Sequence, residues 1–311
     1  MRPRRFSIAC IAASALAACQ AVVPDSPQPQ VSGSSVQPTH EAVRAPGASP
    51  EPTPERNRAG PTAFVFAGEL EQGGWIRGQA PGGTRSARLG ETDLVLDEDG
   101  NFFAGIDRDA GATAVLVARL ADGREVRTPV AIAPRAWNIE RVNVAKRPGG
   151  MSDTYWRNVR EPEWNRIQAA RARDSESRGW AQDFIWPVRG RISGRFGAQR
   201  IYRGEPGSYH TGLDIAPGAG TPFVAPADGV VTLAATEPFS LEGHLVILDH
   251  GQGLNSAFLH AASIDVREGD RVVQGQRLGT VGATGRATGP HLHWSIKWRD
   301  ARLDPLLFLD R

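Results

Sequence analysis

The sequence predicts a mainly β protein, and three observations carry that prediction. Residues 64–133 hold short apolar runs separated by turn strings such as Asp97-Glu-Asp-Gly. Residues 223–249 alternate apolar and polar side chains between glycine and proline residues, which is typical of antiparallel strands. One stretch, residues 161–173, indicates a helix. We therefore expect a small β-sandwich-like domain, a helical connector and a C-terminal domain built on an antiparallel β-sheet.

The first 18 residues resemble a signal peptide. Three arginines, Arg2, Arg4 and Arg5, precede the apolar run 8–16. This run is shorter than the about 20 residues that a membrane-spanning helix needs, so residues 1–18 are expected to be a cleaved leader rather than a span.

The end of this leader is similar to a lipobox. Its residues are Leu16-Ala-Ala-Cys19, followed by Gln20. The resemblance implies that Cys19 becomes the acylated first residue and anchors the protein to a membrane of the cell envelope. The residue after the cysteine is not aspartate, and this pattern resembles the sorting signal for the periplasmic face of the outer membrane. Ordinary cleavage after Ala18, which would leave a free Cys19, is the alternative.

Residues 19–63 are expected to form a disordered tether behind that anchor. Residues 20–63 contain nine prolines and no aromatic residue, so they offer little apolar surface to bury. A flexible chain of this length reaches roughly 35 to 40 Å, and proline stiffness extends that reach.

The segment 64–133 is expected to be a small β-sandwich. The predicted strands are residues 64–66, 75–78, 92–96, 101–105 and 113–120. None of them carries a recognisable catalytic pattern.

The connector, residues 134–183, is expected to contain one helix that begins near Glu161 with Pro162 in its first turn. Three residues, Trp164, Ile167 and Arg171, share one face of that helix at steps of three and four. We expect this connector to pack on the C-terminal domain, with Trp180 and Phe184 as further contacts.

The C-terminal domain, residues 184–311, contains residues suited to a metal site. His210 and Asp214 are four positions apart, and one histidine of the pair His291 and His293 could complete a set of three ligands that leaves a position for water. A fully extended chain would separate the Cα atoms of His210 and Asp214 by about 13 Å. A bend is therefore needed, and Gly212 could supply it. The two-residue step from His291 to His293 puts both imidazoles on one face of a strand.

These motifs resemble those of the M23 family of zinc metallopeptidases, the lysostaphin or LytM type. The resemblance rests on His210-x-x-x-Asp214 and His291-x-His293, and on further strings such as Gly194-Arg-Phe-Gly. It covers roughly residues 184–311. It implies that His210, Asp214 and His293 bind one Zn²⁺ per chain, with His260 and His291 as the catalytic pair that does not bind metal.

The sequence lacks the motifs of several other kinds of catalytic and binding site. There is no His-Glu-x-x-His string, so the proton acceptor is expected to be an imidazole rather than a glutamate. The two cysteines, Cys10 and Cys19, both lie in the leader region, which leaves no thiolate for catalysis. No glycine-rich phosphate loop is present, so no nucleotide is expected. The formal charge falls from +2 to −1 when the three leader arginines are removed, so no nucleic acid is expected as a partner.

The remaining histidines are expected to be structural. His40 lies in the proline-rich tether and His244 lies beside a glycine. His250 follows a predicted strand and is expected to form structural hydrogen bonds.

The family resemblance implies an endopeptidase that cuts the peptide cross-links of peptidoglycan, with the bond from D-alanine to diaminopimelate favoured. Zinc would activate water, and His260 and His291 would shuttle a proton or stabilise the oxyanion, in an order that stays open. Two loops, residues 198–209 and 236–243, are the predicted walls of a substrate groove. The first contains Arg200, Tyr202 and Arg203.

Two other classes are weighed against this one. A wall-binding regulator that activates other hydrolases would lack metal ligands, whereas this sequence keeps all three. A lipoyl-type carrier would resemble residues 269–279 but needs a lysine at the turn, and none lies there. For residues 64–133 we expect a spacing or positioning role, with wall binding and occlusion of the active site as alternatives.

Overall fold

The computed structural model describes residues 60–146 and 151–310. The leader 1–18, the anchor Cys19 and most of the tether 19–63 lie outside the described residues, as does His40. Among the described residues, no helix has both the length and the apolar character needed to cross a membrane.

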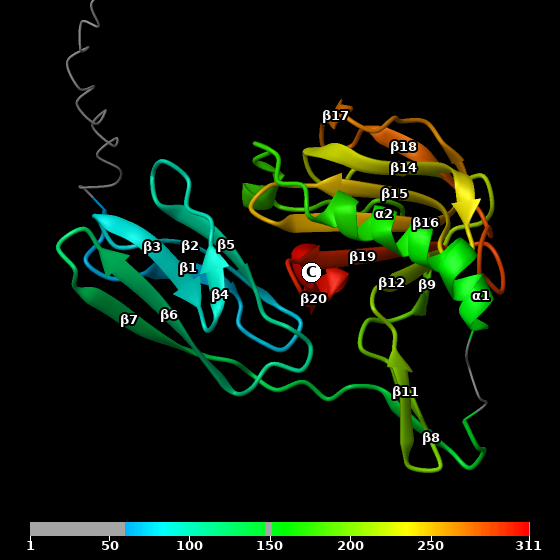
Figure 1. Cartoon of the computed structure of the whole chain (residues 1–311), viewed down its shortest axis with the longest axis horizontal. Coiled ribbons are helices and arrows are strands. Elements are labelled where there is room, and N and C mark those ends of the chain that lie inside the picture. Colours follow the sequence, from blue (N-terminus) through cyan, green and yellow to red (C-terminus); the bar gives the residue numbers. More distant parts are fainter. Residues whose placement is uncertain (1–59, 147–150, 311) are drawn as a thin grey trace, which may run out of the picture. The chain divides into compact units, whose positions relative to one another are not determined.

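The N-terminal segment consists of two antiparallel sheets, with strand orders β1-β2-β5 and β4-β3-β6-β7 (Figure 1). The strands are β1 (Val65–Glu69), β2 (Trp75–Gln79), β3 (Thr84–Leu89), β4 (Thr92–Leu94), β5 (Asn101–Gly105), β6 (Thr113–Leu120) and β7 (Glu125–Ala131). Phe102, Phe103 and Leu116 are fully buried between them. The predicted β-sandwich is confirmed. The prediction missed β3, whose sequence is mostly polar, and β7, which contains Pro129.

The connector contains one strand and a continuous helical stretch. These are β8 (Ile139–Val142), α1 (Asp153–Tyr155), the π-helical η1 (Trp156–Arg160) and α2 (Glu161–Arg171), followed by the short 3₁₀ helix η2 (Gly179–Ala181). The predicted helix is present as α2, with Pro162 near its beginning, but the helical stretch starts eight residues earlier than predicted, at Asp153. Strand β8 was not predicted. A π-helical stretch inside a helix is uncommon and often marks a functional site.

The C-terminal segment is built on a ten-stranded sheet with the order β17-β14-β15-β16-β19-β12-β9, to which β13, β18 and β20 add at the sides. Its strands are β9 (Arg191–Gly194), β12 (Leu213–Ala216), β13 (Pro222–Val224), β14 (Gly229–Phe239), β15 (Gly243–Asp249), β16 (Leu254–Ile264), β17 (Arg271–Val272), β18 (Arg277–Val281), β19 (Leu292–Trp298) and β20 (Ala301–Leu303). A 3₁₀ helix, η3 (Pro305–Phe308), follows. All pairings within this sheet are antiparallel, as predicted.

One face of this sheet is covered by α2. Ile167 and Ala170 of the helix pack with residues of β14, β15 and β16, among them Leu245 and Ala257. Trp164, which was expected on the packed face, is 39% exposed. The helix therefore covers part of β14, β15 and β16 (Figure 1).

The opposite face joins the main core. Trp294, Phe258 and Leu292 are fully buried there, and the predicted contacts Trp180 and Phe184 belong to the same cluster. Hydrogen bonds join the N-terminal segment to this core. The Trp75 Nε1 donates to the carbonyl of Leu307 (2.8 Å), and the Phe103 N–H donates to Gln252 Oε1 (2.7 Å).

A third, small sheet is formed by strands that precede β12 in the chain. It contains β10 (Gln199–Tyr202) and β11 (Glu205–Tyr209), which form a hairpin, and β8 of the connector, which pairs in parallel with β10. The predicted loop 198–209 is thus a hairpin extended by a strand that lies about 60 residues earlier in the chain.

Candidate metal centre and active site

His210, Asp214 and His293 converge on one point. The ligand atoms of all three lie within 4.8 Å of one another. The His210 Nε2 is 3.0 Å from Asp214 Oδ1, the His293 Nδ1 is 2.8 Å from the same oxygen, and the two nitrogens are 3.1 Å apart. Two imidazole nitrogens and one carboxylate oxygen at such spacing form a donor set suited to a metal ion.

Two neighbouring strands bring these residues together. Asp214 of β12 and His293 of β19 are direct cross-strand partners. His210 lies just after β11, and its backbone is held by Ala198 and Gly197 across the hairpin. The sheet register therefore places two candidate ligands side by side, and the residue after the hairpin is the third.

Gly212 has a different role from the one that the sequence predicted. Its φ lies outside the left-handed region, so no special bend depends on it. A Cβ at this position would lie 2.5 Å from the carbonyl oxygen of Trp294 and 2.7 Å from His293 Nε2. Glycine is required here because β19 passes so close.

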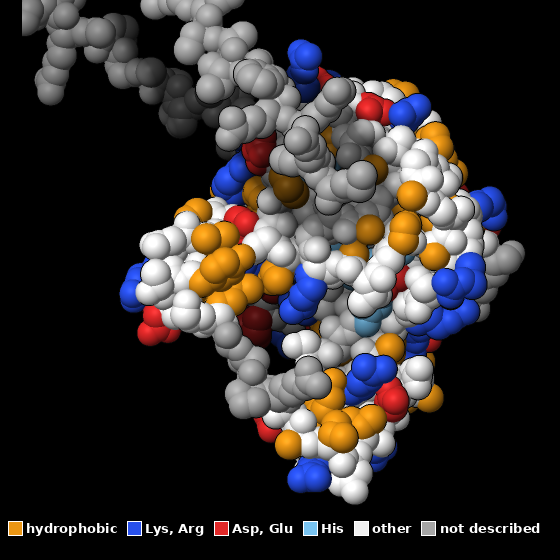
Figure 2. Space-filling model, turned by 90° about the vertical axis from the view of Figure 1, so that its right-hand side faces the viewer, with side chains coloured by type: hydrophobic (Ala, Val, Ile, Leu, Met, Phe, Trp, Pro, Cys, Tyr) orange, Lys and Arg blue, Asp and Glu red, His pale blue; other side chains and the backbone are white. Residues whose placement is uncertain are grey.

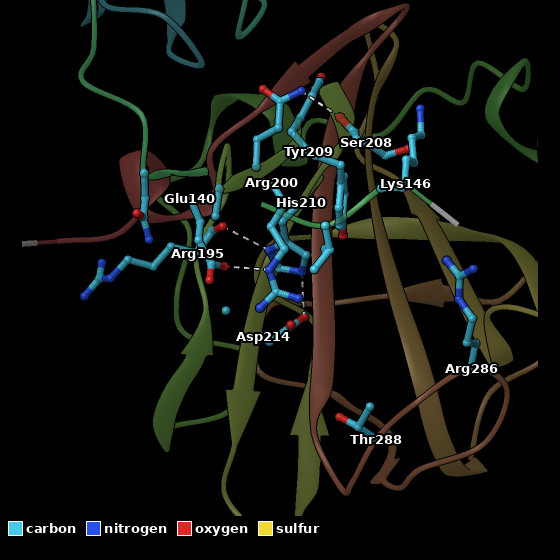
Figure 3. Close-up of a pocket in the computed structure, with 18 residues that line it drawn as sticks. Glu140, Lys146, Arg195, Arg200, Ser208, Tyr209, His210, Asp214, Arg286 and Thr288 are labelled. Carbon is cyan, nitrogen blue, oxygen red and sulfur yellow. Dashed lines mark hydrogen bonds and ion pairs between the residues drawn. The ribbon is translucent and has the colours of Figure 1, made fainter. Parts of the chain in front are cut away.

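Hydrogen bonds fix the ring of His210. Its Nδ1 is 3.0 Å from the carbonyl oxygen of Arg195, which can only accept, so Nδ1 carries the proton and Nε2 keeps its lone pair. A donor bond of this kind on the far nitrogen is typical of metal-binding histidines. Dashed lines in Figure 3 mark these contacts of His210.

Electrostatics favour a charged carboxylate at the centre. Burial would raise the pKa of Asp214, but its hydrogen bonds to His210 and His293 and their charges hold the pKa well below the ordinary value. Burial lowers the pKa of His293, against the effect of Asp214. Burial also opposes a charge on His210, yet the bond and the charge of Asp214 outweigh it and raise the pKa of His210.

His260 and His291 form a second pair beside the ligands. Their ring centroids are 4.8 Å apart, and the His260 ring is 6.3 Å from that of His293. The His260 Nδ1 donates to the carbonyl of Thr284 and the His291 Nδ1 to the carbonyl of Gly289, both at 2.8 Å. Because carbonyls only accept, both rings keep Nε2 unprotonated when neutral. The His291 Nε2 lies 3.7 Å from Asp214 Oδ1, outside hydrogen-bonding range.

The backbone of His260 is unusual. Its φ is +66°, in the left-handed region that few residues other than glycine adopt. The pairing of β15 with β16 shifts register here, because three residues from His244 to Val246 face four from Phe258 to Ala261. Such a bulge re-aims a side chain. Burial lowers the pKa of His260, and the bond to Thr284 opposes this effect.

A groove of 1130 Å³ runs along the centre. Arg286 and Thr288 lie on one side of His210 and Asp214, and Glu140 and Arg195 lie on the other (Figure 3). Histidine side chains reach the surface on this face, together with Lys and Arg side chains (Figure 2).

The predicted groove walls are correct in part. Arg200 and Tyr202 line the groove, whereas Arg203 does not. The segment 236–243 does not line it, and residues 286 and 288 take that place. The sequence also gave no indication of the connector residues in the wall, which are Asn138, Glu140, Val144, Ala145 and Lys146. In the sequence only the charges of Glu140 and Lys146 distinguish these residues. Their position in the wall depends on the pairing of β8 with β10, which is a long-range contact.

Two of the other histidines are structural, as predicted. His250 is fully buried, its Nδ1 donates to the carbonyl of Asp228 (2.7 Å), and its Nε2 accepts from the Ser256 hydroxyl (2.8 Å). The His244 Nδ1 donates to the carbonyl of Ala261 (3.2 Å).

Comparison with known proteins agrees with this geometry. Residues 208–305 match the model of peptidase family M23. Over 110 residues, 34% of this chain and 24% of the relative, the sequence is 39% identical to the peptidoglycan DD-endopeptidase ShyA of Vibrio cholerae. Over 134 residues, 41% of this chain and 21% of the relative, it is 35% identical to the cell division protein DipM of Caulobacter vibrioides. The chain thus spans about a quarter of the length of these curated relatives.

A solved structure resembles more of the chain. It is the crystal structure of a Pseudomonas aeruginosa protein described as a candidate M23 peptidase. The TM-score is 0.56 and the sequence identity is 29%, with 82% of this chain and 96% of that chain covered. The likeness therefore extends beyond the residues that the family model matches.

Proposed function

We propose that this chain, whose residues 208–305 match peptidase family M23, is a zinc-dependent endopeptidase that cuts peptide cross-links of bacterial peptidoglycan. The observation that carries this proposal is the convergence of His210, Asp214 and His293 next to the pair His260 and His291. Two of these residues, His210 and Asp214, also line an open groove.

The residues present fit a zinc ion. Two imidazoles and one carboxylate match the ligands of hydrolytic zinc sites, and the set leaves a coordination position open. His210, Asp214 and His293 would hold the ion, which when bound supplies Lewis-acid polarisation of a carbonyl group and lowers the pKa of a water molecule. Nothing in this set suits a soft metal, since no sulfur ligand is near among the described residues.

His260 and His291 would handle the proton. Each ring has its Nδ1 proton bound to a carbonyl, so Nε2 is the atom that can accept a proton from the attacking water. The lowered pKa of His260 keeps this ring neutral, and therefore competent as a base, toward lower pH. Once protonated, an imidazole here can donate to the leaving amine or to the developing oxyanion.

The groove suits an extended, acidic peptide. Four cationic side chains line it, from Lys146, Arg195, Arg200 and Arg286, against the carboxylates of Glu140 and Asp214. Arg200 is engaged by Glu140 at 2.6 Å. Lys146 is engaged by Glu205 at 2.8 Å. Arg195 and Arg286 are placed to meet carboxylates, which are abundant in wall stem peptides. We propose the bond from D-alanine to diaminopimelate as the scissile bond, in keeping with the DD-endopeptidase activity named for ShyA.

The location follows from the leader rather than from the fold. We propose that Cys19 is acylated and holds the enzyme at the periplasmic face of the outer membrane, with residues 20–63 as a tether. Two acyl signals on one residue give stable anchoring.

Digestion of purified wall material, with mass analysis of the products, tests the activity. The expected result is conversion of cross-linked muropeptide dimers to monomers, lost on chelation and regained with zinc. Free stem peptides would instead indicate an amidase. Zinc-loaded protein that binds wall material without cutting it would support the alternative of a regulator.

A further inference from the structure

A second pocket, of 230 Å³, lies at the C-terminal end of α2, outside the groove described above. Four cationic residues line it, which are Arg171, Arg173, Lys297 and Arg299, together with the two acidic residues Asp174 and Asp300. Its remaining lining residues are small or neutral. The excess of positive charge favours an anionic ligand.

Arg171 is the unusual member of this pocket. Its Nε is buried and has no hydrogen-bond partner, and none of the ion pairs found among the described residues includes Arg171, Arg173 or Arg299. Burial, and then the charge of Arg302, lower the pKa of Arg171 to about 10, against the charge of Glu242, with which Arg171 forms no ion pair. A buried guanidinium without a carboxylate is costly unless an anion pairs with it.

The charge of Lys297 is also poorly balanced by acidic neighbours. Its side chain is 16% exposed, and its one acidic contact, Asp300 at 3.4 Å, is a fully exposed residue. Burial and then the charge of Arg171 lower the pKa of Lys297, against the effect of Asp300. Arg171 and Lys297 are thus two largely buried cations that line one pocket and repel each other.

The pocket and the metal centre share one face of the sheet. His293, Ser295 and Lys297 alternate along β19, so their side chains point the same way. Ser295 is paired with Ala257, which packs under α2. The Cα atoms of His293 and Lys297 are about 13 Å apart, the span of four extended residues.

We propose that this pocket binds an oxyanion through Arg171 and Lys297, and that its ligand is a carboxylate of the wall peptide beyond the scissile bond. The first part stands on the pocket alone. The second part rests on the proposed function. A free phosphate offers the same chemistry and is the competing source of the anion.

Binding is tested first on zinc-loaded protein by calorimetry with inorganic phosphate and with a purified muropeptide dimer. Arg171→Met and Lys297→Met should each weaken binding to this pocket about 10-fold, the loss of one charge-assisted hydrogen bond. Arg166→Met is the matched control, because Arg166 lies on the same helix with an exposed side chain. Arg171→Met removes an unpaired buried charge, so it should fold with undiminished thermal stability.

The source of the anion is decided by hydrolysis. With dimers that keep free carboxyl groups, Arg171→Met should raise KM about 10-fold with kcat unchanged, and amidated dimers should show no difference between the variant and the wild type. If wild type and Arg171→Met bind phosphate equally well and bind muropeptide equally well, the proposal that this pocket binds an oxyanion would be wrong. Tight phosphate binding with the same KM for free and amidated dimers would overturn the peptide assignment. A wild type that cuts no dimer would defeat the proposed function, while the binding measurement still decides the pocket.

Discussion

Arg160 forms two hydrogen bonds with the carboxylate of Glu242, at 2.7 and 2.8 Å, and the backbone carbonyl of Glu242 accepts the N–H of His260 at 2.9 Å. The connector is thereby joined to the histidine that adopts a left-handed backbone. Arg160 also contacts Glu163, which in turn accepts from the N–H and the hydroxyl of Ser240. The whole network surrounds the turn from which His260 is held.

We predict that Arg160→Lys lowers kcat about 10-fold with little change in KM. Lysine keeps the charge but cannot form both parallel bonds, so the turn and the His260 ring should shift. The variant should retain zinc, because no ligand is touched. The charge-swapped double variant Arg160→Glu with Glu242→Arg should recover part of the activity, whereas Arg166→Lys should behave like wild type. An unchanged kcat in folded Arg160→Lys would contradict a positioning role.

Metal binding and turnover should separate by mutation. Replacing His210, Asp214 or His293 by Ala removes one ligand and should lose zinc. His260→Ala or His291→Ala should keep near-stoichiometric zinc and lose at least about 10²-fold in activity, since each removes a proton carrier. Metal analysis of the purified variants is the measurement. A metal-free His291→Ala beside a loaded His293→Ala would reverse the assignment.

Stability should fall in mild acid through His250. Burial lowers the pKa of His250 to about 4, from an ordinary value near 6.5. Between these values the unfolded chain binds a proton that the folded protein refuses, so the free energy of unfolding decreases as pH falls from about 6.5 to about 4, by at most about 3 kcal/mol. Urea unfolding across this range measures the slope. His250→Gln should flatten it, and an equal slope in that variant would assign the effect to other groups.

Gly212→Ala should damage the metal centre while leaving the fold largely intact. The added methyl group would meet both the backbone of Trp294 and the ring of His293, so β12 and β19 must move apart. We expect zinc affinity to fall about 10-fold or more, as when the support of a ligand is lost. Gly111→Ala is the control, because nothing lies within 4 Å of its added Cβ. If Gly212→Ala binds zinc as tightly as wild type, β19 can move to accommodate the methyl group without disturbing the metal site.

Cys19→Ala should convert a membrane-bound protein into an exported, unanchored one. An acylated cysteine is the attachment that the leader implies. Membrane fractionation, with mass analysis of the mature N-terminus, measures this. Continued membrane association of Cys19→Ala would require another anchor.

The sequence predicts the ligands better than their surroundings, for a physical reason. The pairs His210 with Asp214 and His291 with His293 are local in sequence. Imidazole and carboxylate groups at such short spacing indicate metal binding by themselves. The left-handed conformation of His260 and the contact of residues 138–146 with the groove depend on register between distant strands. Such long-range pairing leaves no period in the sequence. Gly212 illustrates the limit, since its position was noticed but its cause, the approach of β19, is visible only in the fold.

The parallel pairing of β8 with β10 has a consequence for where the C-terminal domain begins as a folding unit. Residues 208–305 match the family model, yet a fragment that starts near residue 184 would leave the backbone of β10 unpaired along one edge. An open edge of this kind invites strand exchange and aggregation. The folding unit of the C-terminal domain therefore includes β8, which lies outside the residues that the family model matches.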